Sequence, residues 1–301
     1  MSDLFPGFGE RRLATRQAEI FLRIGGSGPP LLLLHGFPQT HSMWHKLAAE
    51  LCGCFTLVIP DLRGYGLSSC PSNDESNRVY SKRAMGEDFF EIMTSLGYAK
   101  FAVAGHDRGG RVAYRMALDS PQRVAALVVL DIVPTLHMWH SFDAGFAMKT
   151  YHWLFLAQPN PLPEMLIERA PIAFLDYTLA SWTKTKNLSA FDEAALAEYR
   201  FHFATPEHVH ATCNDYRAGW TYDHKADEAD RSLGRRIESP TLAIWGDDGF
   251  PSAVEGTLDP WKSWCTDVRG NSVDSGHFVA EENPKDTLDQ LMPFLLEYAV
   301  E

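Results

Sequence analysis

A short apolar run that enters a glycine-flanked turn and leaves it as a helix places the strongest constraint on this chain. The apolar run covers residues 101–105, and a helical pattern begins near Gly109. Asp107 stands at the centre of the turn, with Gly105 and Gly109 two residues away on either side. Glycines are expected there because a side chain would collide with the neighbouring strand or helix. The pattern predicts a buried strand, a sharp turn that presents Asp107, and a helix over residues 109–119.

Other apolar runs predict that this strand belongs to a mostly parallel sheet. Continuous apolar runs are typical of strands that helices cover on both faces. Strands are expected at residues 11–16, 18–24, 31–34, 55–60, 101–105, 125–130, 241–245 and 268–273. Helices are expected near residues 81–96 and 109–119, and from Asn283 and Pro284 onward, a fitting cap and first-turn pair. The fold class is therefore α/β, with helices flanking the sheet.

The alternation of strands and helices is interrupted in the second half of the chain. From about Thr135 to Arg236, aromatic residues, prolines and helical periods replace it, and the strand pattern returns at residues 241–245. We interpret residues 135–236 as a helical cap inserted into a core formed by residues 1–134 and 237–301. A cap of this kind excludes water from a site and supplies residues to its pocket.

Length and composition are those of a globular protein. With 301 residues, 45% of them hydrophobic, the chain can bury a full core. The formal net charge of −12 argues against nucleic acid or an anionic membrane as a partner. No apolar run reaches the length of about 18 residues that a membrane span needs, and the N-terminus shows no secretion signal. A cytoplasmic protein is expected.

The cysteines and potential metal ligands form no recognisable pattern. The cysteines are Cys52, Cys54, Cys70, Cys213 and Cys265. They include no C-x-x-C pair and leave one over, which is unlike a disulfide framework, so scattered buried thiols are expected. Because the sequence has no HExxH segment and no clustered ligands, no metal and no organic cofactor is expected.

An aspartate at the centre of such a turn favours chemistry at a saturated carbon. A carboxylate can displace a leaving group from an sp3 carbon and form an ester with the enzyme. A histidine-activated water then hydrolyses the ester, while two backbone N–H groups hold the oxyanion on the Asp107 carbonyl. We expect these donors to be the N–H groups of Arg108 and Phe37, the latter following the buried strand at residues 31–34.

Two arginines beside Asp107 point to an anionic substrate. Arg108 and Arg111 are three residues apart and share a face in the first turn of the helix. Guanidinium groups that lose water without gaining a partner are costly, whereas a substrate carboxylate would accept forked hydrogen bonds from them. The alternative is that both only neutralise Asp107 or lie along the surface. The helix dipole disfavours a cation at this end, so their joint presence favours a functional role.

The run GHDRGGR at residues 105–111 resembles the corresponding turn of fluoroacetate dehalogenases, a branch of the α/β-hydrolases that cleaves short haloacids. The similarity covers nearly the whole chain, including HGFP at residues 35–38 and DLRGYGLS at residues 61–68. It implies the α/β-hydrolase fold with an inserted cap. It also implies a hydrolase acting on carbon–halide bonds that converts short 2-haloacids, such as fluoroacetate and chloroacetate, to glycolate and halide. The expected partner is a small haloacid, and the family is often homodimeric.

The resemblance also assigns the remaining catalytic groups. His277, in a Ser-Gly-His-Phe context after the final strand, matches the base in the superfamily order of nucleophile, acid and histidine. The acid matches Asp131, which stands at the end of the strand expected at residues 125–130. This strand follows the turn around Asp107, called the elbow in this superfamily, and the helix after it. Asp248 is the alternative, because many α/β-hydrolases take the acid from the next strand. There, however, the usual spacing falls on Gly249.

A leaving fluoride needs hydrogen-bond donors because it is costly to strip of water. By resemblance to the halide-binding segments of the family, His152, Trp153 and Tyr216 offer an imidazole N–H, an indole N–H and a phenol O–H. The alternative is that these three residues are part of the cap core, with polar tips at its rim.

Two other functions remain open. An epoxide hydrolase shares the His-Gly-x-Pro segment, the nucleophilic aspartate and a cap, but typically has an aromatic residue after the nucleophile and needs two cap tyrosines. Arg108 and Arg111 argue against that activity, and Arg108 also argues against a haloalkane dehalogenase. A non-catalytic binding protein is possible because fold does not fix function. The presence of Asp107, Asp131 and His277 together argues against it.

Overall fold

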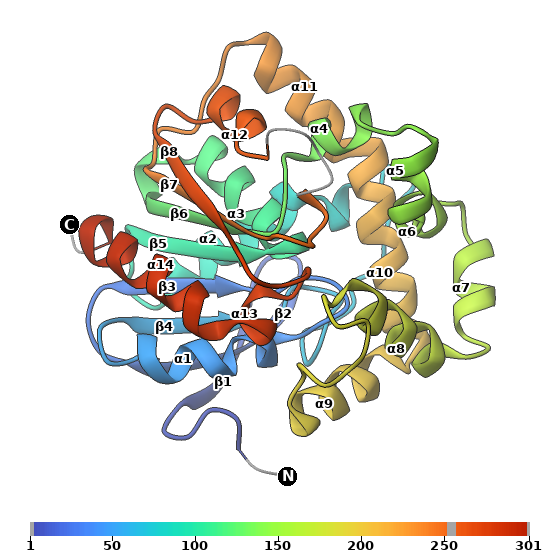
Figure 1. Ribbon diagram of the computed structural model, residues 1–301, viewed down its shortest axis with the longest axis horizontal. Helices are drawn as coiled ribbons and strands as arrows, with labels where there is room; N and C mark the ends of the chain where they lie inside the picture. Colours follow the sequence, from blue (N-terminus) through green and yellow to red (C-terminus); the bar gives the residue numbers. More distant parts are fainter. Residues whose placement is uncertain (1–2, 252–256, 300–301) are drawn as a thin grey trace.

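An eight-stranded sheet lies at the centre of the computed structural model, which describes residues 3–251 and 257–299 (Figure 1). The strand order is β1-β2-β4-β3-β5-β6-β7-β8, with β2 antiparallel to both neighbours and the remaining pairs parallel. The strands are β1 (Gly9–Ala14), β2 (Glu19–Gly26), β3 (Pro30–Leu34), β4 (Thr56–Pro60), β5 (Phe101–His106), β6 (Val124–Leu130), β7 (Thr241–Gly246) and β8 (Val268–Val273). The predicted fold class, a mostly parallel α/β sheet, is confirmed.

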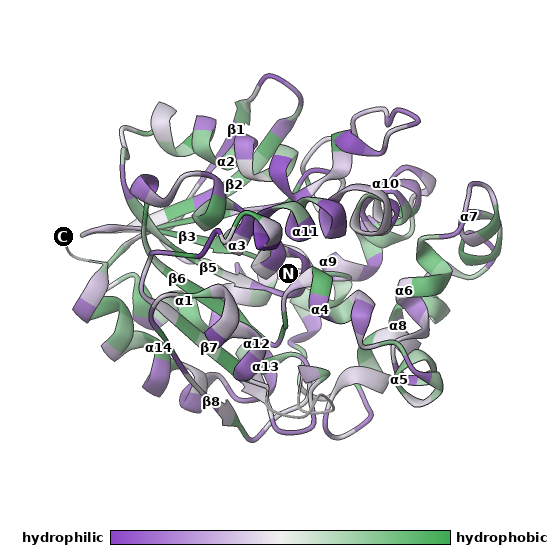
Figure 2. Ribbon diagram, turned by 90° about the horizontal axis from the view of Figure 1, so that it is seen from above, coloured by the Kyte–Doolittle hydropathy of each residue, from purple (hydrophilic) through white to green (hydrophobic). Residues whose placement is uncertain are grey.

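The strand boundaries agree with the sequence pattern to within two residues. β8 begins and ends at the predicted positions, whereas β1 begins two residues earlier than expected. Every residue of β5 is buried, because neighbouring strands and helices surround it on all sides. In Figure 2 the hydrophobic residues gather along the central strands.

Helices cover both faces of the sheet. On one face, α1 (His45–Leu51) packs against α14 (Pro284–Tyr298), and on the other, α2 (Lys82–Ser95) packs against α3 (Asp107–Asp119) (Figure 1). Two short helices precede α14 in the sequence, α12 (Asp259–Trp264) and α13 (Val279–Glu282). The last helix begins as predicted, with the Asn283 side chain accepting a hydrogen bond from the backbone N–H of Asp286. Its Leu291 and Leu295 are buried, while Leu288 is half-buried.

The segment of the chain between β6 and β7 forms a helical layer, which lies over one end of the sheet (Figure 1). Its helices are α4 (Thr135–His140), α5 (Ala144–Lys149), α6 (Tyr151–Leu156), α7 (Leu162–Ile167), α8 (Pro171–Trp182), α9 (Glu193–Phe203), α10 (Pro206–Ala218) and α11 (His224–Ser232). A π-helical turn, Gly219–Asp223, joins α10 to α11. Buried ion pairs from Arg115 on α3 to Asp227 and Asp230 on α11 fix this layer, the cap, to the sheet helices.

The cysteines are all free, as expected, but they are not all buried. Cys213 and Cys265 are buried, Cys52 and Cys70 are half-buried, and Cys54 is exposed. The prediction of buried thiols was therefore wrong for Cys54, which lies in the turn before β4. Within the described residues, no helix is both long enough and apolar enough to cross a membrane.

Candidate active site

The turn between β5 and α3 is as sharp as the sequence predicts. Asp107 is the first residue of α3 and has a φ of 43°, a left-handed conformation that is strained for a residue with a side chain. Gly109 makes the turn possible, because a Cβ there would lie only 2.6 Å from the backbone carbon of Leu34 in β3. Asp107 is 6% exposed. The strained turn thus holds a nearly buried carboxylate at the carboxyl ends of the strands.

The loop after β3 directs a backbone donor at this carboxylate. The Phe37 N–H donates to Asp107 Oδ2 at 3.1 Å. His35 ties this loop to the loop after β4, because its Nε2 accepts a hydrogen bond from the backbone N–H of Leu62 at 2.9 Å. The other expected donor, the N–H of Arg108, belongs to the first turn of α3, where backbone N–H groups have no partner within the helix.

His277 lies beside Asp131. The distance between His277 Nδ1 and Asp131 Oδ2 is 2.6 Å, and Asp131 Oδ1 accepts a hydrogen bond from the Gly246 N–H at 2.9 Å. Burial raises the pKa of the Asp131 carboxyl, and the hydrogen bond with His277 opposes that shift. His277 Nε2 is buried and has no hydrogen-bond partner among the described residues. It is therefore available to accept a proton from another molecule.

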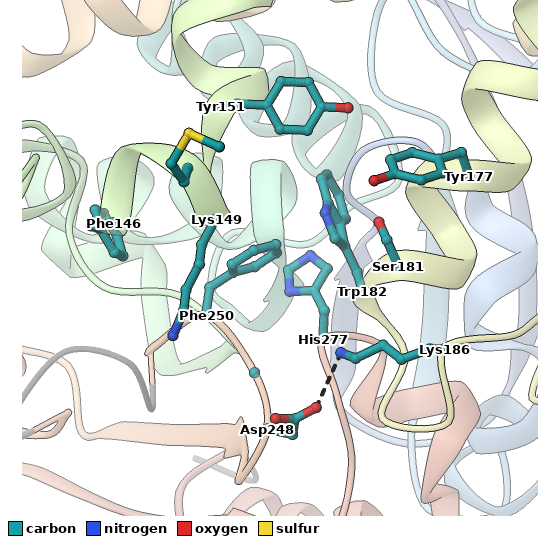
Figure 3. A pocket seen from close by; sticks show the side chains of 12 residues that line it. Phe146, Lys149, Tyr151, Tyr177, Ser181, Trp182, Lys186, Asp248, Phe250 and His277 are labelled. Atoms are coloured by element: carbon teal, nitrogen blue, oxygen red, sulfur yellow. Dashed lines mark hydrogen bonds and ion pairs between the residues drawn. The ribbon is translucent and has the colours of Figure 1, made fainter. Parts of the chain in front are cut away.

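Asp248, the alternative acid, does not contact His277. Its carboxylate is half-exposed and pairs with Lys186 Nζ at 3.1 Å, as Figure 3 shows. Both side chains line an open pocket of about 580 Å3. The structure thus brings Asp131, and not Asp248, to the imidazole.

Arg108, one of the two arginines expected to bind a substrate carboxylate, already has a carboxylate partner within the protein. Its Nε and Nη2 donate to the two carboxylate oxygens of Asp215 on α10, at 2.9 and 2.6 Å. Its guanidinium also lies over the Tyr216 ring, 4.2 Å from the centroid. The cap, which is distant in sequence, supplies this carboxylate, so the sequence did not reveal the pairing. Nη1 of Arg108 nevertheless remains without a partner among the described residues.

Arg111 fits the expectation better. Its Nη1 donates to the Val133 carbonyl at 3.0 Å and to Thr135 Oγ1 at 3.1 Å, and its guanidinium lies 4.5 Å from the Trp153 ring centroid. Among the described residues it forms no salt bridge, and its Nε has no hydrogen-bond partner. Burial lowers the pKa of Arg111, while the Asp107 carboxylate opposes that shift. A buried guanidinium with spare donors therefore lies next to the Asp107 carboxylate.

The three predicted halide donors come together from two cap helices. His152 and Trp153 lie on α6 and Tyr216 on α10, and all three are at most 3% exposed. The Tyr216 ring is 5.9 Å from the Trp153 ring and 5.8 Å from the His152 ring, measured between centroids. Burial lowers the pKa of His152 to about 3. The imidazole is therefore neutral at ordinary pH, and its Nδ1 has no partner among the described residues.

A small cavity lies beside Asp107, next to a larger pocket. The inner cavity, about 10 Å3 in volume, has room for one water-sized group. Its lining includes Asp107, Arg111, His152, Trp153, Trp182, Phe250 and His277. The outer pocket, about 580 Å3, shares Trp182, Phe250 and His277 with the inner cavity (Figure 3). The route from the outer pocket to Asp107 therefore passes these three side chains.

Sequence reasoning missed Trp182 and Phe250. The Trp182 ring is 5.4 Å from the His277 ring, and the Phe250 ring is 5.0 Å from it. The backbone carbonyl of Trp182 also accepts a hydrogen bond from the His277 N–H at 2.9 Å. No motif marks these aromatic residues in a cap rich in aromatics. Sequence reasoning also missed Asp215 and Lys82, although Asp215 directly precedes the predicted Tyr216.

Known proteins resemble this chain over most of its length. The family model described as "alpha/beta hydrolase fold" matches residues 29–284. A fluoroacetate dehalogenase from Burkholderia sp. is 41% identical over 292 residues, which cover 97% of this chain and 95% of that protein. A soluble epoxide hydrolase from Corynebacterium sp. (strain C12) is 31% identical, with 89% and 91% covered. The solved structure of a putative epoxide hydrolase from Pseudomonas aeruginosa is 42% identical, with a TM-score of 0.93 and 100% of both chains covered.

Proposed function

This chain belongs to the α/β-hydrolase fold family, and from that premise we propose that it hydrolyses short 2-haloacids such as fluoroacetate and chloroacetate to glycolate and halide. The resemblance to fluoroacetate dehalogenases is confirmed by the relative from Burkholderia sp.. One observation carries the proposal. Asp107 and Arg111 line the same small cavity, and the buried Arg111 guanidinium has an Nε donor with no hydrogen-bond partner among the described residues. A nucleophile and a carboxylate-binding cation are the two groups that a haloacid requires.

In the first step, Asp107 displaces the halide. Phe37 holds Oδ2 of the carboxylate, so Oδ1 is the oxygen that attacks the α-carbon of the substrate. A C–O bond forms, the C–halogen bond breaks, and the halide leaves with the bonding electron pair. Arg111 and the free Nη1 of Arg108 are the donors available to the substrate carboxylate. The product of this step is a glycolyl ester of Asp107.

In the second step, water hydrolyses the ester. His277 Nε2 takes a proton from a water molecule, whose oxygen attacks the Asp107 carbonyl carbon. The negative charge develops on Oδ2, where the Phe37 N–H already donates and the Arg108 N–H is the proposed second donor. Asp131 holds Nδ1–H of His277 and stabilises the imidazolium that forms. Collapse of the intermediate breaks the bond between the Asp107 carbonyl carbon and Oδ1, and the His277 imidazolium gives its proton to the leaving oxygen. Glycolate is released with Oδ1, and the oxygen from water remains on Asp107, which returns to the carboxylate by losing a proton to solvent.

We assign His152, Trp153 and Tyr216 to the leaving halide. The neutral imidazole, the indole and the phenol supply three donors in a setting that excludes water, and a desolvated fluoride needs such compensation. A substrate that reaches Asp107 has to widen the inner cavity, which favours a two-carbon acid over longer ones. The similarity to the fluoroacetate dehalogenase from Burkholderia sp. also supports a site for fluoride.

Epoxide hydrolysis is the second candidate, because two of the similar proteins carry that name. It uses the same nucleophile and base, but it requires acids that protonate the epoxide oxygen. In related enzymes two cap tyrosines supply these protons. Tyr216 is one such cap tyrosine, whereas the cap tyrosines Tyr151 and Tyr177 line the outer pocket and not the inner cavity that contains Asp107. A non-catalytic role is the third reading, and the Asp107, Asp131 and His277 arrangement speaks against it.

We further propose that the enzyme is a cytoplasmic homodimer. The free cysteine thiols support a reducing compartment. Large apolar side chains on the cap, such as Met148, Leu166 and Tyr177, are 80%, 52% and 64% exposed and support contact with a second copy. Light scattering at micromolar concentration tests the dimer, and a monomer mass would contradict it.

The activity is tested by following halide and diol in parallel. We expect fluoride from fluoroacetate, chloride from chloroacetate, and no diol from an aryl epoxide. Diol without halide would make the protein an epoxide hydrolase, and neither product would favour a binding role. Asp107→Asn should abolish halide release in freshly purified enzyme. A single turnover in heavy-oxygen water with enzyme in excess should place label on the Asp107 carboxylate, and label in glycolate alone would contradict the ester.

A further inference from the structure

Three charged side chains from separate elements meet beside the turn that carries Asp107. Lys82 is the first residue of α2, Arg108 lies in the first turn of α3, and Asp215 lies on α10 of the cap. Each is at most 2% exposed. Burial of a charge is costly unless a partner offsets it, so the three charges have to be considered together.

The Asp215 carboxylate joins the two cations. Both of its oxygens accept hydrogen bonds from Arg108, and Oδ1 also forms an ion pair with Lys82 Nζ. The Tyr65 hydroxyl donates to Oδ2 at 2.8 Å. Nη1 of Arg108 has no partner among the described residues. The acceptors of Asp215 are therefore occupied, whereas Arg108 still has a donor to offer.

The pairing creates an electrostatic problem for an anionic substrate. A guanidinium in direct contact with one carboxylate presents little net charge to a third group in a poorly screened interior. Asp107, the proposed nucleophile, is itself an anion and repels the substrate. If Asp215 alone acted on Arg108, Arg111 would have to offset both Asp107 and the incoming carboxylate.

A further carboxylate makes the imbalance larger. Asp223 Oδ1 accepts the backbone N–H of Lys82 at 2.9 Å, and Asp223 Oδ2 has no hydrogen-bond partner among the described residues. Burial raises the pKa of Asp223 to about 6, so this carboxyl is mostly ionised at neutral pH. Burial and Arg108 lower the pKa of Lys82, and Asp215 opposes that shift. The Lys82 ammonium lies where it can offset both carboxylates.

We propose that Lys82 is a positioning residue for haloacid binding: its ammonium neutralises Asp215, so that Arg108 is held in place by the cap and still keeps its positive charge for the substrate carboxylate. The inference rests on the proposed function. It gives Lys82 no contact with the substrate and predicts an effect through Arg108.

A purely structural role would have a different signature. If the Lys82 and Asp215 pair only tied α2 to the cap, removing both partners would be at least as damaging as removing one. If the charge balance matters, a variant that loses both charges together keeps the net charge of the cluster. The pair therefore provides its own control.

The experiment compares Lys82→Met with the double variant Lys82→Met/Asp215→Asn. In Lys82→Met we expect the KM for fluoroacetate and the inhibition constant of acetate to rise roughly tenfold, with kcat within about threefold. The double variant should return both constants to within about threefold of the wild type. Lys82→Arg, which keeps the cation, should also bind acetate nearly as well as the wild type.

Two results would overturn the inference. One is unchanged acetate binding in Lys82→Met, and the other is a double variant that binds acetate no better than Lys82→Met. If Lys82→Met does not fold, Lys82→Gln removes the same charge while keeping a donor for Asp215. The proposed function fails separately, if the wild-type chain releases no fluoride from fluoroacetate. If the wild type releases fluoride and the Lys82 variants bind acetate as the wild type does, only the role of Lys82 is overturned.

Discussion

The carboxylate of Asp131 occupies the space that a side chain at position 249 would need. A Cβ on Gly249 would lie 2.8 Å from Asp131 Oδ2 and would collide with Oδ1. An acid at the end of β7, in the usual spacing, would therefore compete with Asp131 for one place beside His277. The glycine at position 249 and the aspartate at position 131 are two parts of a single arrangement.

This arrangement predicts opposite results for two substitutions. Asp131→Asn should lower the turnover of fluoroacetate by a factor on the order of 1,000 to 10,000, because His277 loses the group that fixes its tautomer. The loss should fall on ester hydrolysis, so mass spectrometry of the elbow peptide should show the glycolyl ester accumulating. Asp248→Asn is the matched control and should change turnover less than about twofold, since it breaks a half-exposed ion pair. The reverse pattern would refute the assignment.

The halide donors predict a difference between halogens. Trp153→Phe and Tyr216→Phe should each slow C–F cleavage about ten- to a hundredfold more than C–Cl cleavage, because a hydrogen bond to a charged group contributes about 1.5–3 kcal/mol. Initial rates on fluoroacetate and chloroacetate measure this. Trp139→Phe is a fitting control, since Trp139 packs against Trp153 but donates its indole N–H to the Gly219 carbonyl. Equal losses on both substrates would argue against a dedicated fluoride site.

Arg111 should be more important for activity than for stability. Arg111→Leu should raise the KM for haloacetates roughly a hundredfold, because it removes charge-assisted hydrogen bonds to the carboxylate. The thermal midpoint should stay level or rise, since an apolar side chain replaces a buried cation with no carboxylate partner among the described residues. Steady-state kinetics and calorimetry test the two parts. A large fall in the midpoint with unchanged kinetics would make Arg111 a structural residue.

Glu281 predicts a pH-dependent effect on stability. It is buried between Gln39, which follows the Phe37 loop, and Tyr199 of the cap. Burial raises the pKa of Glu281 from 4.5 to about 8. The folded state therefore keeps this proton while the unfolded chain loses it, and the stability that the group contributes below pH 4.5 is lost as the pH rises toward 8. The isosteric Glu281→Gln variant carries no such dependence.

Relative to the wild type, Glu281→Gln should therefore gain about 1.4 kcal/mol of unfolding free energy per pH unit between pH 4.5 and 8. Urea unfolding of both proteins at pH 5 and pH 7.5 measures the difference. Lys285→Met, on the exposed surface near the same segment, serves as the control and should show no such trend. A constant difference between Glu281→Gln and the wild type at the two pH values would contradict the prediction.

The sheet and the elbow were predictable because their signals are local. Apolar runs buried on both faces mark β3, β5 and β6, and the glycines around Asp107 follow from the space available in one turn. His277 and Asp131 could be placed because each follows a strand that could be recognised. The resemblance supplied the cap residues His152, Trp153 and Tyr216, which no periodicity distinguishes from ordinary core.

What escaped prediction depends on contacts between distant segments. The pairing of Arg108 with Asp215 joins residues 107 positions apart, and its second cation, Lys82, comes from a third element. Trp182, at the end of α8 in the cap, and Phe250, in the segment after β7, both pack against His277 from parts of the chain that are distant in sequence. The exposure of Cys54 is likewise set by how its turn packs, which its sequence neighbours do not reveal.

The hydrogen bond from the His277 N–H to the Trp182 carbonyl ties the segment that carries the base to the end of α8. A rigid-body movement of this part of the cap away from the sheet would either break this hydrogen bond or displace the segment that carries His277. We therefore expect substrate and product to pass between the outer pocket and the inner cavity by rotation of the Trp182 and Phe250 side chains, which line both. On this expectation, rotamer changes of two aromatic rings, and not movement of the backbone, set how fast small molecules reach Asp107.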